Sequence, residues 1–279
     1  MGGGEVLINW FLTLVNAFRP RVCAVSYLNT LPLVWGMLHG PQRGLFDLEF
    51  RIPSECADRM ASGAADIGIV PSFELTRQDL AIVKGAGIGA HGAVRSILLI
   101  CKRPPAEIRT LAADSSSRTS VQLARVILER RFGATPKIAP HAPDLEAMLR
   151  GADAALLIGD PALKVDRGGE KRLVYDLAEE WQALTGLPMV FAVWAGRREM
   201  VTPELTAAFR ESMLYGRERI GEIVEAEAAR RGFAAEVVRD YLEHRIVHEL
   251  GPRDYDGMDL FLRYAGETAV DEASRTRAV

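Results

Sequence analysis

Two polar turns in this chain each follow a short apolar run and precede a helix-like pattern. The first is Ser26-Tyr27-Leu28-Asn29-Thr30, and the second runs from Ser115 to Ser120 around Arg118. Hydroxyl and amide groups crowded beside buried strands, together with a guanidinium, can donate hydrogen bonds to carboxylates. Helix capping explains one or two of these residues but not the whole cluster. We therefore predict that both turns bind a small anionic ligand.

Further polar residues stand at the ends of other apolar runs, where they would rim the same site. Ser72 follows one run, Gly159 and Asp160 follow another, and Ser96 begins a third. Capping is an equal alternative for Ser72 and Asp160. The expected binding residues are Ser26, Tyr27, Thr30, Ser72, Ser96, Ser117, Arg118, Thr119, Ser120, Gly159 and Asp160.

The two turns belong to an internal repeat. From Ser26 to Pro71 and from Ser116 to Pro161 the interval is 45 residues in both cases. Each copy is predicted to contain a strand, a polar turn, a helix, a second helix, a glycine, an aspartate and a buried strand. This order is typical of a parallel α/β sheet. We predict an α/β fold with two similar lobes and a ligand cleft between them.

The expected division of the chain follows from the breaks in this pattern. Lys102-Arg103-Pro104-Pro105 interrupts an apolar run, and the apolar run at 189–194 can carry the chain back. We expect one lobe at 1–103 and 196–279 and the other at 104–195. Thr202-Pro203-Glu204 is a strong helix start, and the helix should run to about Arg231. Shorter helical patterns follow, and the tail from Asp271 is expected to be loose.

Composition restricts the function classes. The chain of 279 residues is 48% hydrophobic and 25% charged, with a formal charge of -3, which favours a globular fold and argues against nucleic-acid binding. Its cysteines, Cys23, Cys56 and Cys101, have no metal-binding spacing and read as buried free thiols, as in a reducing cytoplasm. The apolar segment from Val6 to Phe18 reads as an extra helix or an over-long start, with an atypical export signal as the alternative.

Two motifs that suggest other chemistry fail in their context. Gly87 to Gly92 matches GxGxxG, but an apolar run instead of a helix follows, which argues against a dinucleotide site. His244 and His248 have a zinc-like spacing, but the glutamate of HExxH is missing and no third ligand is evident. We interpret both histidines as ordinary surface or capping residues and expect no metal.

Several segments together resemble the chorismate dehydratases of the futalosine route to menaquinone. They lie in order between Arg21 and Tyr264 and are Ser26 to Leu33, Ile69 to Leu75, Ser117 to Ser120, Ile158 to Leu163, and Trp181 to Trp194. The resemblance implies a fold similar to type II periplasmic binding proteins. It also implies a hydro-lyase that converts chorismate to 3-[(1-carboxyvinyl)oxy]benzoate and water without a metal or organic cofactor.

By the same resemblance, Asn29 occupies the family's catalytic asparagine position. An amide is no general base at neutral pH, so we expect Asn29 to orient the substrate and its leaving hydroxyl, while the substrate's own enolpyruvyl carboxylate takes the proton. The remaining polar residues would hold the carboxylates as the lobes close.

Three other functions compete with this interpretation. The fold also serves solute-binding proteins, which bind a small carboxylate without turnover. The related dihydroxynaphthoate synthase of the same pathway is the second alternative, although the Ser-Tyr-Leu-Asn-Thr turn matches the dehydratases better. A regulatory effector-binding module is a distant third.

Overall fold

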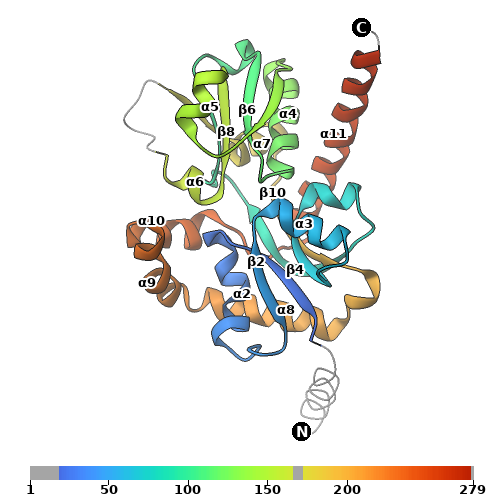
Figure 1. Cartoon of the computed structure of the whole chain (residues 1–279), viewed down its shortest axis with the longest axis vertical. Helices are drawn as coiled ribbons and strands as arrows, with labels where there is room; N and C mark the ends of the chain where they lie inside the picture. Colours follow the sequence, from blue (N-terminus) through green and yellow to red (C-terminus); the bar gives the residue numbers. More distant parts are fainter. Residues whose placement is uncertain (1–18, 166–171, 278–279) are drawn as a thin grey trace.

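The computed structural model of the chain describes residues 19–165 and 172–277, with side chains up to residue 268. The expected helix or export signal at Val6 to Phe18 lies outside the described residues. Two five-stranded sheets, each with its own helices, are stacked along the long axis of the molecule (Figure 1). The structure confirms the α/β fold with two lobes.

The first sheet has the strand order β2-β1-β3-β10-β4. Its strands are β1 (Arg21–Val25), β2 (Asp47–Arg51), β3 (Ile67–Pro71), β4 (Ala81–Ala90) and β10 (Met189–Gly196). Strand β1 is parallel to β2 and β3, whereas β10 is antiparallel to β3 and β4.

The second sheet repeats this pattern with the order β7-β6-β8-β5-β9. Its strands are β5 (Ile97–Cys101), β6 (Thr110–Asp114), β7 (Lys137–His141), β8 (Ala154–Ile158) and β9 (Leu173–Asp176). Strand β6 is parallel to β7 and β8, and β5 is antiparallel to β8 and β9. The repeat predicted from the sequence is therefore present as a repeated topology. The matching interval is less regular than expected, because β3 ends at Pro71 but β8 ends at Ile158, three residues before Pro161.

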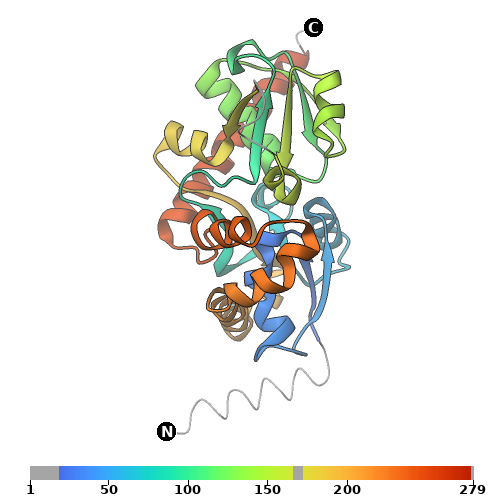
Figure 2. The ribbon, with the colours of Figure 1, turned by 90° about the vertical axis from the view of Figure 1, so that its left-hand side faces the viewer.

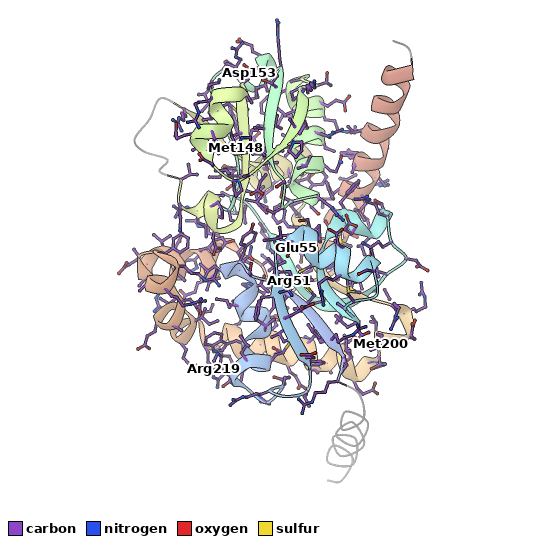
Figure 3. All side chains as sticks on the ribbon, in the orientation of Figure 1. Arg51, Glu55, Met148, Asp153, Met200 and Arg219 are labelled. Atoms are coloured by element: carbon purple, nitrogen blue, oxygen red, sulfur yellow. The ribbon has the colours of Figure 1, made fainter. Side chains whose placement is uncertain are left out.

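One aspartate in each copy fixes the relative position of two parallel strands. Asp66, just before β3, accepts a hydrogen bond from the backbone nitrogen of Arg21 at the start of β1 at 2.9 Å. Asp153, just before β8, accepts the equivalent bond from Thr110 at the start of β6 at 3.1 Å. Figure 3 labels Asp153 at the outer end of the second lobe, far from the junction of the lobes. These repeated aspartates are structural.

The helices of the first lobe are α2 (Leu31–His39), α3 (Pro53–Ala61), α8 (Pro203–Arg217), α9 (Ile220–Arg231) and α10 (Ala235–Asp240), with a π-helical turn η5 (Tyr241–Arg245). Those of the second are α4 (Thr119–Phe132), α5 (Leu145–Gly151), α6 (Gly159–Leu163) and α7 (Leu177–Thr185). Short 3-10 turns are η1 (Leu28–Thr30), η2 (Ser72–Thr76), η3 (Pro105–Glu107) and η4 (Arg198–Met200).

The helix expected from Thr202 to Arg231 begins as predicted but is broken into two. The Thr202 side chain caps α8 by accepting a hydrogen bond from the Leu205 nitrogen at 3.2 Å. At Arg219 the backbone leaves the helical region, with φ −119° and ψ 29°, and α9 starts in a new direction. After the break, α9 buries Ile220 and Ile223 in the core.

The last helix, α11 (Pro252–Arg277), has a helical backbone through the segment from Asp271, which was expected to be loose. It leaves the first lobe and runs along α4 of the second, as both views show (Figures 1 and 2). Phe261 and Tyr264 pack edge-on against Trp181 of α7, with centroids 6.1 and 6.0 Å apart. This helix therefore joins the two lobes.

Sheet membership places the chain crossings away from the boundaries expected at 103/104 and 195/196. Strand β5 belongs to the second sheet and β10 to the first, so the chain crosses between Ala90 and Ile97 and again between Thr185 and Met189. We propose lobe boundaries that follow the sheets. The apolar pattern of β5 and β10 identified them as strands, but it carried no information on which sheet they join.

Candidate functional site

The polar turns of the two lobes face each other, because each follows the carboxyl end of a parallel strand. Turn η1 follows β1, and helix α4 begins after β6, so the two clusters meet at the junction of the lobes. A small cavity of about 60 Å³ lies between them. Its polar lining consists of Tyr27, Asn29, Thr30, Ser96, Ser117, Thr119, Ser120 and Gly159.

The rest of this wall is apolar, with Ile88, Val94, Phe191 and Ile246 among its residues. Among the described residues that line the cavity, none is Asp, Glu, His, Lys or Arg. Tyr27 is the titratable member, and burial raises its pKa to about 12. The wall therefore offers neutral donors and acceptors at neutral pH, but no side-chain base.

Asn29 is held at both its side chain and its backbone. Its Nδ2 donates to the hydroxyl of Tyr241 at 3.1 Å, and Nε2 of His248 donates to its backbone oxygen at 2.8 Å. Because a carbonyl can only accept, His248 must carry its proton on Nε2. Burial lowers the pKa of His248 to about 4, so the ring is neutral near pH 7.

Tyr27 spans the cleft from the first lobe to the second. Its hydroxyl lies 3.1 Å from Oγ of Ser116, and its ring covers Gly159 so closely that a Cβ there would lie 2.6 Å from ring carbons. Gly159 has φ +59°, which also favours glycine. The next residue, Leu28, donates its backbone N–H to Oδ1 of Asp160 at 2.9 Å.

The start of α4 contributes hydroxyls from the second lobe. Oγ of Ser117 accepts from the Ser120 nitrogen at 3.1 Å and so caps the helix. The Thr119 hydroxyl accepts from the Phe73 nitrogen at 3.2 Å and lies 3.4 Å from Oγ of Ser72. Capping and lobe contact thus occupy part of this hydroxyl set, while the helix start keeps a positive dipole end directed at the cavity.

Ser96 lies at the first crossing between the lobes and is fixed by the strained residue before it. Arg95 has φ +64°, an uncommon value for a residue with a side chain. The Asp176 carboxylate holds it there by accepting its backbone N–H at 2.6 Å. Burial raises the pKa of Asp176. The hydroxyl of Ser96 in turn accepts a hydrogen bond of 2.8 Å from Tyr241.

Four expected binding residues lie outside the cavity lining. They are Ser26, Ser72, Arg118 and Asp160. The Arg118 guanidinium pairs instead with Glu74 at 3.0 Å and Asp58 at 2.6 Å, across the junction of the lobes. Asp160 pairs with Arg231 at 2.6 Å, and Ser72 donates to the Val190 oxygen at 2.8 Å. In this arrangement Arg118 and Asp160 form ion pairs between the lobes, whereas the hydrogen bond from Ser72 to Val190 lies within the first lobe.

His248 corrects the interpretation made from the sequence. It was expected to be an ordinary surface or capping residue, but it is 3% exposed and contacts Asn29, whereas His244 is exposed. Tyr241 and Arg231 were also missed. Their local sequence is that of unremarkable helices, and their contacts to the site span more than 200 residues of chain or cross between lobes.

The glycines of the GxGxxG match have a packing role. Gly87 and Gly89 lie within β4, and a Cβ at Gly87 would come within 2.6 Å of Leu250 and 2.8 Å of the Ala192 oxygen. Glycine is therefore needed where the C-terminal segment crosses the sheet. Both glycines therefore lie inside a strand and not at the start of a helix.

A larger groove of about 890 Å³ lies on the outer side of the segment from Leu242 to Glu249. Some of its charged side chains are already paired, since Arg217 contacts Glu249 at 2.8 Å and Arg245 contacts Asp240 at 3.0 Å. The groove and the smaller cavity share Ile246 in their linings. None of the residues of the two polar turns lines the groove. The smaller cavity between the lobes is therefore the candidate functional site.

Within the described ranges, no group of three or more His, Cys, Asp or Glu side chains is arranged to hold a metal ion. No described helix is both long and apolar enough to span a bilayer. The three cysteines are buried and free, as the sequence indicated.

Comparison with known proteins identifies a family that matches most of the chain. Residues 20–267 match the profile of a family described as menaquinone biosynthesis. A chorismate dehydratase of Thermus thermophilus is 34% identical over 244 residues, covering 80% of this chain and 88% of that protein. A chorismate dehydratase of Campylobacter jejuni is 24% identical over 245 residues, covering 86% and 94%.

Solved structures with low identity share the fold. A protein of Archaeoglobus fulgidus has a TM-score of 0.65 at 16% identity, covering 91% of this chain and 98% of its own. The periplasmic aliphatic sulphonate binding protein of Escherichia coli has a TM-score of 0.62 at 17% identity, covering 91% and 88%. These matches confirm the predicted resemblance to periplasmic binding proteins.

Proposed function

Because the chain belongs to the menaquinone biosynthesis family, we propose that it is the enzyme that dehydrates chorismate to 3-[(1-carboxyvinyl)oxy]benzoate. Two relatives that cover most of the chain bear the name chorismate dehydratase. The cavity between two polar turns supplies the matching site. The reaction is a hydro-lyase step, and its organic substrate is a small dianion.

The chemistry needs little beyond positioning. The ring carbon that bears the enolpyruvyl ether loses a proton, the neighbouring carbon loses its hydroxyl, and the new double bond completes an aromatic ring with release of one water. The departing proton is vinylogous to the ring carboxylate, so negative charge can spread into that group before the hydroxyl leaves. Aromatisation drives the step, and the protein must bind two carboxylates and orient the leaving group.

One observation carries the assignment of roles: the cavity wall has neutral donors and no side-chain base. Ser117, Ser120 and the start of α4 would bind one carboxylate through hydroxyls and backbone N–H groups. Asn29 would donate to the leaving hydroxyl. With Tyr27 kept protonated by a pKa of about 12, the substrate's own enolpyruvyl carboxylate is the base that remains for the proton.

The cavity volume adds a conformational step. About 60 Å³ is far below the roughly 300–1,000 Å³ of ordinary ligand sites, so the lobes must separate to admit chorismate. Closure then excludes water from the charged intermediate. We place this chemistry in the cytoplasm, where the three buried thiols would remain reduced.

The test is to incubate the purified chain with chorismate and to follow the aromatic enol ether by mass and ultraviolet absorbance. Asn29→Ala should lower kcat by roughly 100-fold or more, the usual effect of losing one donor at a developing charge. Ser115→Ala is the control, since Ser115 is an exposed hydroxyl of the other turn. Binding of chorismate without loss of water would indicate a solute-binding protein instead.

A further inference from the structure

A single C-terminal segment encloses Asn29 and Ser96 from behind the cavity. Tyr241 is 1% exposed and lies within hydrogen-bond distance of both polar side chains, at 3.1 Å from Nδ2 of Asn29 and 2.8 Å from Oγ of Ser96. Asn29 and Ser96 line the cavity, whereas Tyr241 is not among its lining residues. Tyr241 can therefore influence a bound molecule through these two neighbours.

The hydrogen-bond directions follow from the number of protons. A phenol carries one proton and can accept through its oxygen, and here it donates that proton to Ser96. The contact with Asn29 must then run from the amide N–H to the phenol oxygen. Ser96 receives a hydrogen bond at its oxygen, so its own proton is available to the cavity that it lines.

This arrangement makes both Asn29 and Ser96 hydrogen-bond donors toward the cavity. The second N–H of the Asn29 amide and the O–H of Ser96 are left to donate, which suits a carboxylate or a departing hydroxyl. Without the phenol oxygen, the Asn29 amide could rotate and present its own oxygen to an anion, which is repulsive. Burial raises the pKa of Tyr241, so its hydroxyl keeps its proton throughout the neutral range.

We propose that Tyr241 is a positioning residue that fixes Asn29 and Ser96 as hydrogen-bond donors toward the substrate. The effect of Tyr241 on turnover rests on the proposed function. Tyr241 acts through other side chains and does not itself touch the reacting atoms.

The surrounding segment is rigid enough for this task. Tyr241 begins the π-helical turn η5, a feature that is common at functional sites. Six residues later, Val247 exchanges two backbone hydrogen bonds with Gly89 of β4, both 2.8 Å long. His248 then bonds the Asn29 backbone, so one short segment fixes the asparagine at two points.

Tyr241→Phe is the direct test, because it removes one oxygen atom and keeps the ring. We expect kcat to fall roughly 10- to 100-fold while KM changes less than about threefold, since the donors remain but lose their preferred orientation. Tyr255→Phe is the matched control. Its hydroxyl also accepts a hydrogen bond, from the Gly85 nitrogen at 2.9 Å, but lies outside the site, and kcat should stay within about twofold.

Coupling to Asn29 separates positioning from a general loss of structure. If Tyr241 acts through Asn29 and Ser96, adding Tyr241→Phe to Asn29→Ala should cost much less rate than it does in the wild type. Full multiplication of the two effects, or a Tyr241→Phe enzyme with wild-type kcat, would overturn the proposal.

A second test uses NMR spectroscopy and does not depend on turnover. The chain has three asparagines, Asn9, Asn16 and Asn29, so selective ¹⁵N labelling gives three pairs of side-chain amide signals, and Asn29→Ala identifies the relevant pair. Tyr241→Phe should shift the Asn29 amide signals, and Tyr255→Phe should leave them in place. A wild-type chain that makes no product would refute the proposed function, whereas unchanged Asn29 signals would refute the role of Tyr241.

Discussion

His248 makes the stability of the protein depend on pH at the scale of one residue. Its pKa is lowered by burial to about 4, against an ordinary value of 6.5. The unfolded chain therefore binds a proton that the folded chain rejects between these values. Stability from this group is fully present above pH 6.5 and is lost as the pH falls toward 4, by up to about 3 kcal/mol.

His248→Gln tests this dependence, because a glutamine N–H can still reach the Asn29 oxygen but does not titrate. We expect the free energy of unfolding in urea to fall less steeply from pH 7 to pH 5 in the variant than in the wild type. His244→Gln, at an exposed position, should follow the wild-type curve. Parallel curves for all three proteins would show that His248 titrates normally in the folded state.

The site was partly predictable at this scale. Tyr27, Asn29, Thr30, Ser117, Thr119 and Ser120 line the cavity as expected, because each lies beside a strand end that local patterning identifies. Tyr241 and His248 could not be found in this way, since they reach Asn29 from 212 and 219 residues away in sequence. The sequence also does not show that Arg118, expected to bind a carboxylate of the ligand, pairs with Glu74 and Asp58.

At the scale of elements, the junction of β8 and α6 depends on a glycine that the opposite lobe covers. We predict that Gly159→Ala lowers stability by about 1 kcal/mol, because φ is +59°, and also lowers kcat/KM, because the new Cβ would meet the Tyr27 ring at 2.6 Å. Urea unfolding and the chorismate assay measure the two effects separately.

Gly133→Ala is the matched control for this variant. Gly133 ends α4 with φ +66°, but no atom lies within 4 Å of the position that its Cβ would occupy. It should lose a similar amount of stability and keep wild-type kcat/KM. If both variants kept full activity, contact between Tyr27 and Gly159 would have no part in closing the site.

Many elements were predictable because local rules specify them. Capping at Thr202, glycine stops and buried strands all follow from short-range patterns. The assignment of β5 and β10 to their sheets was not, since two equally apolar strands fit either core. The break at Arg219 was also missed. The helical periodicity of the sequence continues past Arg219, although the backbone leaves the helical region there.

At the scale of the whole molecule, ion pairs hold the two lobes in the closed arrangement. Arg231 of the first lobe pairs with Asp160 of the second at 2.6 Å, with side chains 16% and 17% exposed. Arg118 of the second pairs with the buried Glu74 of the first at 3.0 Å. Partial burial makes such pairs stronger than surface pairs, so together they can set the balance between open and closed molecules.

The variant Arg118→Gln/Asp160→Asn removes one charge from each pair without leaving its partner alone. Glu74 keeps Arg77, and Arg231 keeps Glu227. We expect a larger radius of gyration in solution scattering without ligand, and a KM raised roughly tenfold with a smaller change in kcat, because substrate must first repopulate the closed form. Added product, 3-[(1-carboxyvinyl)oxy]benzoate, should restore the compact profile.

Arg239→Gln is the control variant. It removes a pair with Glu243 inside the first lobe and should change neither the radius of gyration nor KM. Identical scattering and KM in the double variant and the wild type would mean that α11 and the buried contacts, rather than these ion pairs, determine closure.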